Sequence, residues 1–228
     1  MLKGELDHVK AAEKYADDVI SGKILACKWA KLACERHRKD IASSITKSFP
    51  YRFDPELGEK TCRFFEKLPH VKGKWAKLDP VTKKRRTLQL EPWQKFIFVS
   101  IFGWVRKDSG KRRFRKARIY VPRKNGKSFI SAALGWWMFA KDGEPGAEVY
   151  AGATSEAQAR MVFKPAHQMA KINPNLPSQF GVTVNAQTLI RDSDGAVFKT
   201  IIGKPGDGDS PHCAITDEYH EHPTSDQL

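Results

Sequence analysis

A strand, a short loop and an apolar helix follow one another directly in the middle of the chain, and this order constrains the fold most. Residues 115–122 (RKARIYVP) have the composition of a strand, and the apolar stretch FISAALGWWMFA predicts a helix that ends before Gly143. Beyond it, strands are expected near 147–154, 182–191, 196–202 and 212–216, with a helix capped by Ser155. This alternation predicts an α/β fold with a mostly parallel sheet flanked by helices.

The loop between that strand and helix reads VPRKNGKS, residues 121–128. Backbone N–H groups of a loop that opens a helix surround a phosphate well, and the helix N-terminus adds partial positive charge. Gly126 permits the close turn, Lys127 reaches the β- and γ-oxygens of a nucleoside triphosphate, and Ser128 binds Mg²⁺. Val121 stands where the usual GxxxxGK[ST] pattern has its first glycine. The candidate ATP-binding residues in the loop are Arg123, Lys124, Asn125, Gly126, Lys127 and Ser128.

An apolar strand with the sequence CAIT ends in two adjacent carboxylates, Asp217 and Glu218. An ATPase needs one acid that holds Mg²⁺ and one that orients and deprotonates the attacking water. Asp217 is the candidate for the first task and Glu218 for the second. The alternative is a pair of solvated acids at the end of a strand.

The chain carries 40 basic and 26 acidic residues, a formal net charge of +14, and much of this excess is concentrated. Residues 104–124 hold ten basic side chains and one acid, on a predicted hairpin that turns at 108–110. Such clustering attracts a polyanion through counterion release, whereas the alternative is a solvated hairpin that aids solubility. The candidate DNA-binding residues are Lys111, Arg112, Arg113, Arg115 and Lys116.

Helical spacing predicts a helical N-terminal region, with helices near 5–20, 24–43 and 55–67 and a basic loop before residue 90. The expected domains are therefore 1–90, this helical region, and 91–228, the ATPase core. A strongly apolar helix begins at Glu91-Pro92, and its Gln94 is a candidate adenine ligand or else an exposed helix glutamine. Arg160 is a candidate charge donor to a nucleotide or else an ordinary surface arginine.

Hydropathy argues against a membrane protein. No run of about 18 uncharged apolar residues exists, and the stretch 96–105 is too short to span a bilayer. We therefore expect a soluble protein without a membrane partner.

Four segments in this order, LEPWQ, RRFRKARIYVPRKNGKS, YAGATSEAQA and AITDEYHEH, resemble the large terminase subunit of tailed bacteriophages, a motor that packages viral DNA. The resemblance implies a P-loop NTPase of the ASCE type that uses ATP and Mg²⁺. It implies that Lys127 and Ser128 are the loop lysine and metal serine and that Asp217 binds the metal. Glu218 would be the catalytic glutamate and Gln94 the adenine ligand.

The resemblance also implies double-stranded DNA, a small terminase subunit and a portal as partners, a ring of subunits, and the cytoplasm of a bacterial host. A neighbouring subunit would supply an arginine, for which Arg160 is the candidate. In the family, a coupling strand and a nuclease domain follow the acidic pair, whereas this chain ends ten residues after Glu218. We therefore expect a core that is incomplete at its C-terminus, with the nuclease domain absent. Two other functions are compatible with the sequence: a helicase-like, DNA-stimulated ATPase and a catalytically inactive DNA-binding fragment.

Overall fold

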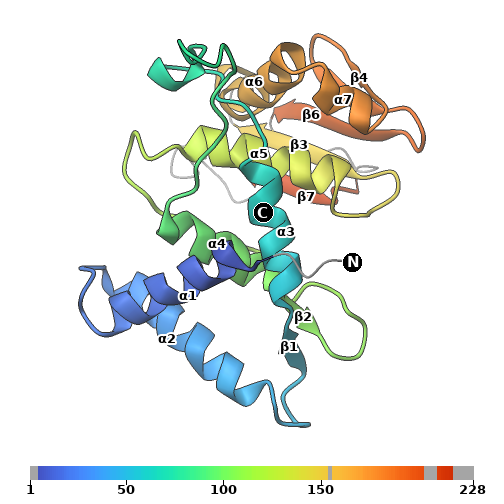
Figure 1. Ribbon diagram of the computed structural model, residues 1–228. Helices are drawn as coiled ribbons and strands as arrows, with labels where there is room; N and C mark the ends of the chain where they lie inside the picture. Colours follow the sequence, from blue (N-terminus) through green and yellow to red (C-terminus); the bar gives the residue numbers. More distant parts are fainter. Residues whose placement is uncertain (1–4, 154–155, 203–209, 218–228) are drawn as a thin grey trace. The chain divides into compact units, whose positions relative to one another are not determined.

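The computed structural model describes residues 5–153, 156–202 and 210–217, and these form two compact units (Figure 1). The first unit comprises the described residues up to Glu66 together with Gln89–Tyr120. The second comprises Lys67–Leu88 and the described residues from Val121 onward. The chain therefore passes between the units three times. The division expected from the sequence, 1–90 and 91–228, stays a prediction.

Helices dominate the first unit. Its described elements are α1 (Asp7–Ile20), α2 (Lys28–Ser43), β1 (Tyr51–Phe53), α3 (Pro55–Phe65), α4 (Pro92–Gly103) and β2 (Trp104–Arg106). The three predicted helices near 5–20, 24–43 and 55–67 are confirmed as α1, α2 and α3. Helix α1 is amphipathic, and the apolar residues that define its spacing are all buried: Val9, Ala12, Ala16 and Val19.

Local capping sets where the helices of this unit begin. Asp54 accepts a hydrogen bond from the N–H of Leu57 at 3.4 Å, and a proline occupies the first turn of α3. The N-terminus of α1 is capped by a residue distant in sequence: Glu59 of α3 accepts the N–H groups of His8 (3.0 Å) and Val9 (3.2 Å). Tertiary contact thus supplies a cap that the sequence around α1 lacks.

An aromatic cluster surrounds the buried imidazole of His37. The indole N–H of Trp104 donates to Nδ1 of His37 at 3.1 Å. The rings of Phe53, Phe96 and Trp104 all lie edge-on to the imidazole, with centroid distances of 5.2 to 5.9 Å. These contacts connect α2, β1, α4 and β2 in one core.

The predicted turn at 108–110 is confirmed, because Gly110 has a φ of 67° and donates its N–H to Arg106 at 3.0 Å. The second arm is much shorter than expected: it pairs with β2 only at the bridge between Val105 and Arg112. Residues 115–122 form no strand, so this prediction was wrong. Strand propensity is insufficient without a neighbour that accepts the backbone hydrogen bonds.

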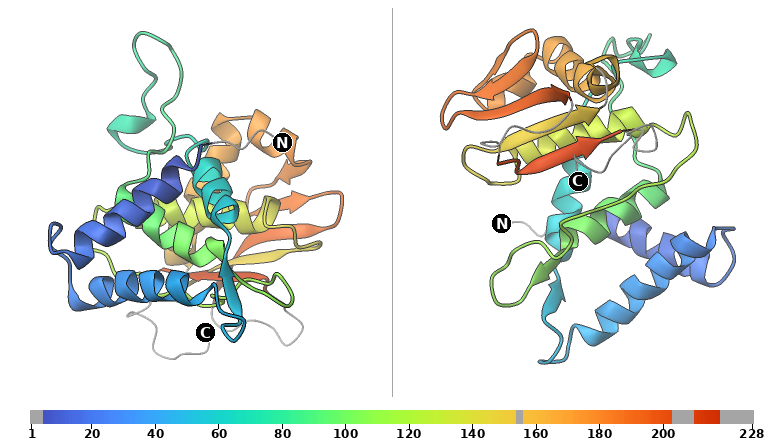
Figure 2. Two further views of the ribbon diagram at one scale, coloured as in Figure 1. Left: turned by 60° about the horizontal axis from the view of Figure 1, so that its bottom comes forward. Right: turned by 180° about the vertical axis from the view of Figure 1, so that it is seen from behind.

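A five-stranded sheet forms the centre of the second unit, with the order β4-β5-β6-β3-β7 (Figure 2). Its described elements are η1 (Lys74–Ala76), α5 (Lys127–Ala140), β3 (Glu148–Ala153), α6 (Glu156–Ile172), α7 (Asn175–Gln179), β4 (Val182–Val184), β5 (Thr188–Arg191), β6 (Ala196–Ile202) and β7 (Cys213–Thr216). The α/β class is confirmed. The expectation of a mostly parallel sheet is only half right.

The sheet is mixed because one part of it is parallel and the other part is antiparallel. Strands β6, β3 and β7 run parallel, whereas β4, β5 and β6 form an antiparallel meander. The turn at Gly195 (φ 71°) joins β5 and β6 in four residues, and so short a connection permits only antiparallel pairing. Helices α5 and α6 pack against each other and against the strands β3 and β6 (Figure 2).

Candidate nucleotide-binding site

The loop before α5 has two residues with left-handed backbone conformations: φ is 68° at Lys124 and 76° at Gly126. Asn125 lies between them, and its side-chain amide donates to the carbonyl oxygens of Pro122 (3.2 Å) and Arg123 (3.3 Å). Alternation of ordinary and left-handed residues turns successive N–H groups towards one side, which creates anion-binding concavities. A non-glycine residue at positive φ is uncommon. The rest of the loop therefore holds the backbone of Lys124 in this conformation.

Helix α5 opens directly from this loop. Gly126 is its N-cap residue, and the carbonyl oxygen of Gly126 accepts the N–H groups of Phe129 and Ile130 at 3.0 Å each. Lys127 and Ser128 occupy the first helical turn and are half-buried. The N–H groups of the first turn have no acceptor within a helix, and the helix dipole places partial positive charge there. The local geometry therefore suits a bound phosphate.

Close packing fixes the position of α5 within the second unit. Trp136 is fully buried, and its indole N–H donates to the carbonyl oxygen of Ala166 in α6 at 3.0 Å. Gly135 lies against the buried ring of Phe198 in β6, so that a β-carbon at Gly135 would be only 2.5 Å from that ring. The loop is therefore carried by a helix whose position is set by the sheet and by α6.

The opposite end of α5 indicates which edge of the sheet the loop faces. Asp142, just beyond α5, contacts His212 at 2.8 Å, and His212 precedes β7. The C-terminal end of α5 therefore lies at the amino end of β7. Since α5 is about 21 Å long and β3 about 20 Å, the N-terminus of α5 lies at the carboxyl-terminal edge of these strands. Parallel α/β sheets bind ligands at this edge.

Asp217 follows β7 directly and is half-buried. The pairing of Gly152 with Thr216 aligns the ends of β3 and β7, so Asp217 lies at the same edge of the sheet as the N-terminus of α5. The structure thus brings the loop and Asp217 to one edge. Glu218, the candidate catalytic residue, lies outside the described residues, and its role stays a prediction.

Gln94 belongs to the first unit, where it caps a helix. It occupies the third position of α4, is 7% exposed, and its side-chain oxygen accepts the N–H of Glu91 at 2.9 Å. The Glu91 side chain in turn accepts a backbone N–H from the first turn of α4, which completes a capping box. The glutamine is therefore buried, unlike the exposed residue that the sequence left as an alternative. Its contact with adenine stays a prediction.

The five candidate DNA-binding residues occupy different environments. Lys111, Arg115 and Lys116 are exposed, whereas Arg112 is half-buried against the ring of Phe102 at 5.2 Å. The guanidinium of Arg113 forms an ion pair with the buried Asp40 at 2.7 Å and lies 4.4 Å from the ring of Tyr51. Arg113 thus holds the basic residues 104–124 to α2. The sequence contained no signal for this role.

Arg160 lies on α6 in the same unit as the loop and is exposed. Its proposed contact with a nucleotide stays a prediction. In the part of the chain that the structure describes, no group of three His, Cys, Asp or Glu side chains forms a metal site. Over the same residues, no helix is both long and apolar enough to cross a bilayer.

Comparison with known proteins agrees with this geometry. Residues 92–228 match the family described as "Terminase large subunit, ATPase domain". The large terminase subunit of Enterobacteria phage HK97 is 28% identical over 134 residues, which cover 58% of this chain and 25% of that protein. The crystal structure of the HK97 large terminase gives a TM-score of 0.55 at 27% identity, covering 72% of this chain and 31% of that one.

The chain therefore spans about a quarter to a third of the length of these relatives. The family match begins at the first residue of α4 and includes both the loop before α5 and Asp217. This family match covers more than half of the residues of the chain. The chain belongs to the family of terminase large-subunit ATPase domains.

Proposed function

We propose that the chain is the ATPase part of a viral DNA-packaging motor, which hydrolyses ATP in order to move double-stranded DNA into a capsid. The observation that carries this proposal is the curled loop at 121–126, which opens α5 at the edge of the sheet where Asp217 also lies. Family membership supports the use of ATP. The parallel strands β6, β3 and β7 support a P-loop NTPase of the ASCE type.

The proposed mechanism begins with binding. The N–H groups of the loop, helped by Arg123 and Lys124, hold the β-phosphate, and the Lys127 ammonium lies against the β- and γ-oxygens. Glu218 orients the attacking water and accepts its proton, and Gln94 recognises adenine. Arg160 of a neighbouring subunit is the candidate for stabilising the charge that develops on the phosphate.

The donor set fits a magnesium ion. The Ser128 hydroxyl and the Asp217 carboxylate are hard oxygen ligands, which Mg²⁺ prefers together with phosphate oxygens and waters. When bound, the ion neutralises phosphate charge and favours departure of the leaving group. Ser128 and Asp217 would hold the ion when it is bound.

We further propose that subunits form a ring around DNA and act with a small terminase subunit and a portal in the cytoplasm of a bacterial host. Lys111, Arg115 and Lys116 are exposed, and in this proposal they contact the phosphate backbone together with Arg112. Strong salt dependence of duplex binding would be the signature of such contacts.

Nucleotide binding is tested with a fluorescent ATP analogue and Mg²⁺. Replacing Lys127 by Ala should weaken binding by about 10- to 150-fold, because a charge-assisted contact contributes about 1.5–3 kcal/mol. The control is Lys164→Ala, at an exposed lysine of α6, which should bind like the wild type. Equal affinity of Lys127→Ala and the control would refute the assignment of the loop.

Hydrolysis is tested separately with Glu218→Gln, measured with and without DNA. This variant should retain nucleotide binding and lose turnover; loss of both would contradict the proposed role of Glu218. Duplex-stimulated turnover without strand separation supports the motor, whereas unwinding of a forked duplex supports a helicase-like enzyme. A wild-type chain that binds DNA but does not hydrolyse ATP would be the inactive DNA-binding fragment.

A further inference from the structure

The segment 68–88 of the second unit is an irregular hairpin with a defined shape. Antiparallel bridges pair Pro69 with Thr87 and Leu78 with Arg85. At its tip, Asp79 accepts the N–H groups of Val81 and Thr82 at 3.0 and 2.8 Å, which stabilises the turn at 80–82. Because its arms are hydrogen-bonded and its tip is capped, the hairpin presents fixed side chains.

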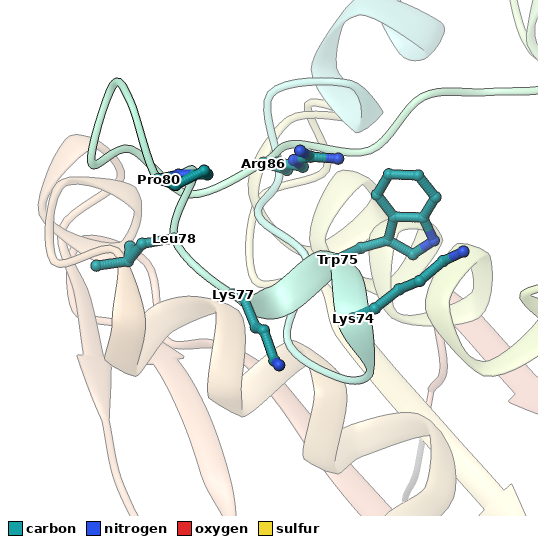
Figure 3. A pocket seen from close by; sticks show the side chains of 6 residues that line it. All are labelled: Lys74, Trp75, Lys77, Leu78, Pro80 and Arg86. Atoms are coloured by element: carbon teal, nitrogen blue, oxygen red, sulfur yellow. The ribbon is translucent and has the colours of Figure 1, made fainter.

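One face of this hairpin is hollowed into a shallow pocket of about 500 Å³ (Figure 3). We call it the Trp75 pocket. It is lined by Lys74, Trp75, Lys77, Leu78, Pro80 and Arg86. The lining therefore combines one indole, two aliphatic side chains and three cations, and it contains no acid.

Trp75 exposes 45% of its surface. The ammonium of Lys74 lies 4.9 Å from the indole centroid, and the guanidinium of Arg86 lies 5.2 Å from it. The imidazole of His70 stacks on the same indole at 6.3 Å, with an interplanar angle of 30°. These contacts hold the indole in place, so that a ligand stacking on it loses little side-chain entropy.

Charge around the pocket has one sign. Residues 70–86 contain seven basic side chains and a single acid, Asp79. The Asp79 carboxylate is engaged by the turn N–H groups and lies 3.7 Å from Arg86. The basic side chains extend past the pocket along the second arm, at Lys83, Lys84 and Arg85. The surface can therefore neutralise more than one phosphate.

A ligand that matches this chemistry has a flat apolar ring joined to an anion. A nucleotide has both, but in a duplex the base faces are covered by neighbouring base pairs. An indole therefore distinguishes unpaired bases, which stack on aromatic side chains with about 1–3 kcal/mol each. A free mononucleotide has the same two groups, but it leaves the cations of the second arm unused.

We propose that the Trp75 pocket binds single-stranded DNA, with one unpaired base stacked on Trp75 and the flanking phosphates held by Lys74, Lys77 and Arg86. The lining of this pocket includes no residue of the loop that begins α5, although His70, which stacks on Trp75, also lies 4.9 Å from the ring of Phe129 in the first turn of that helix. The pocket gives the chain a means of holding a frayed or unpaired DNA end, which duplex contacts along the backbone do not provide.

The test is fluorescence anisotropy with a labelled oligothymidylate of about 12 nucleotides. Trp75→Ala should weaken binding by about 5- to 150-fold, the equivalent of one stacked base, and Trp75→Phe should retain most of the affinity. The matched control is Trp29→Ala, since Trp29 is 74% exposed and also lies beside a lysine, Lys28, at 5.6 Å. This control should bind like the wild type.

Further arms of the experiment separate the sources of the signal. Arg86→Gln should lower the salt dependence of strand binding by about 0.7 in the log–log slope, the value for one phosphate contact. Lys127→Ala should leave strand binding unchanged, so that failure of the ATP site does not count against the pocket. Circular dichroism spectra of all variants should match the wild type, because Trp75 lies on the surface.

Three outcomes would overturn the proposal. The first is unchanged strand affinity in Trp75→Ala. The second is an equal loss for a blunt duplex of the same length, which would mean that the surface recognises phosphates alone. The third is full displacement of the strand by thymidine monophosphate at its own concentration, which would identify the pocket as a mononucleotide site.

Discussion

Acidification should destabilise the first unit through His37. The imidazole is 3% exposed, and its Nδ1 accepts the indole N–H of Trp104 at 3.1 Å, so the folded state requires an unprotonated Nδ1. Burial, followed by the charge of the neighbouring Arg38, lowers the pKa of His37 from 6.5 to about 4. Protonation of His37 therefore competes with folding.

The sign and size of the effect follow from linkage. Between about pH 4 and 6.5 the unfolded chain binds a proton at His37 that the folded chain does not, so the free energy of unfolding falls as the pH is lowered through this window. A pKa difference of about 2.5 units corresponds to about 3 kcal/mol. A loss of this size is a large part of the stability of an ordinary domain.

Urea unfolding at a series of pH values measures this contribution. The comparison variant is His37→Gln, whose side-chain oxygen can still accept the indole N–H of Trp104 but does not titrate. The free energy of unfolding of the wild type should fall by about 3 kcal/mol more than that of the variant across the window. Other groups, including Asp40 and Asp17, are common to both proteins and cancel. Parallel curves for the two proteins would refute the reasoning.

Three further substitutions test the packing and the loop. Gly135→Ala should lower the free energy of unfolding by about 1–2 kcal/mol in urea titrations, because overpacking against Phe198 outweighs the gain in helix propensity; a more stable variant would contradict this. Glu59→Gln should cost about 1–3 kcal/mol, since Glu59 caps α1 through the N–H of Val9. Burial alone would raise the pKa of Glu59, but hydrogen bonds from its partners lower it, so the wild type should lose this advantage at acidic pH while the variant does not. Asn125→Ala should weaken binding of the fluorescent ATP analogue by about 5-fold, the equivalent of one hydrogen bond, because the loop loses its bracing amide; unchanged binding would show that the brace is dispensable.

Prediction from sequence worked wherever local chemistry decides the outcome. The helices near 5–20 and 55–67, the turn at Gly110 and the junction of loop and helix at Gly126 all lie at the predicted positions. In each case the deciding interactions span only a few residues. The conformation of the loop at 121–126 is also set within the segment, by its φ values and by the helix cap at Gly126, whereas ATP binding by this loop stays a prediction.

Tertiary structure decided the features that depend on distant partners. Residues 115–122 have strand propensity but pair with no other strand, and the ion pair of Arg113 depends on Asp40, 73 positions earlier. The mixed order of the sheet and the placement of Asp217 at the edge near α5 also follow from strand pairing. Short-range spacing encodes helices, turns and loops, whereas hydrogen bonds between strands and buried ion pairs are selected only when the whole chain packs.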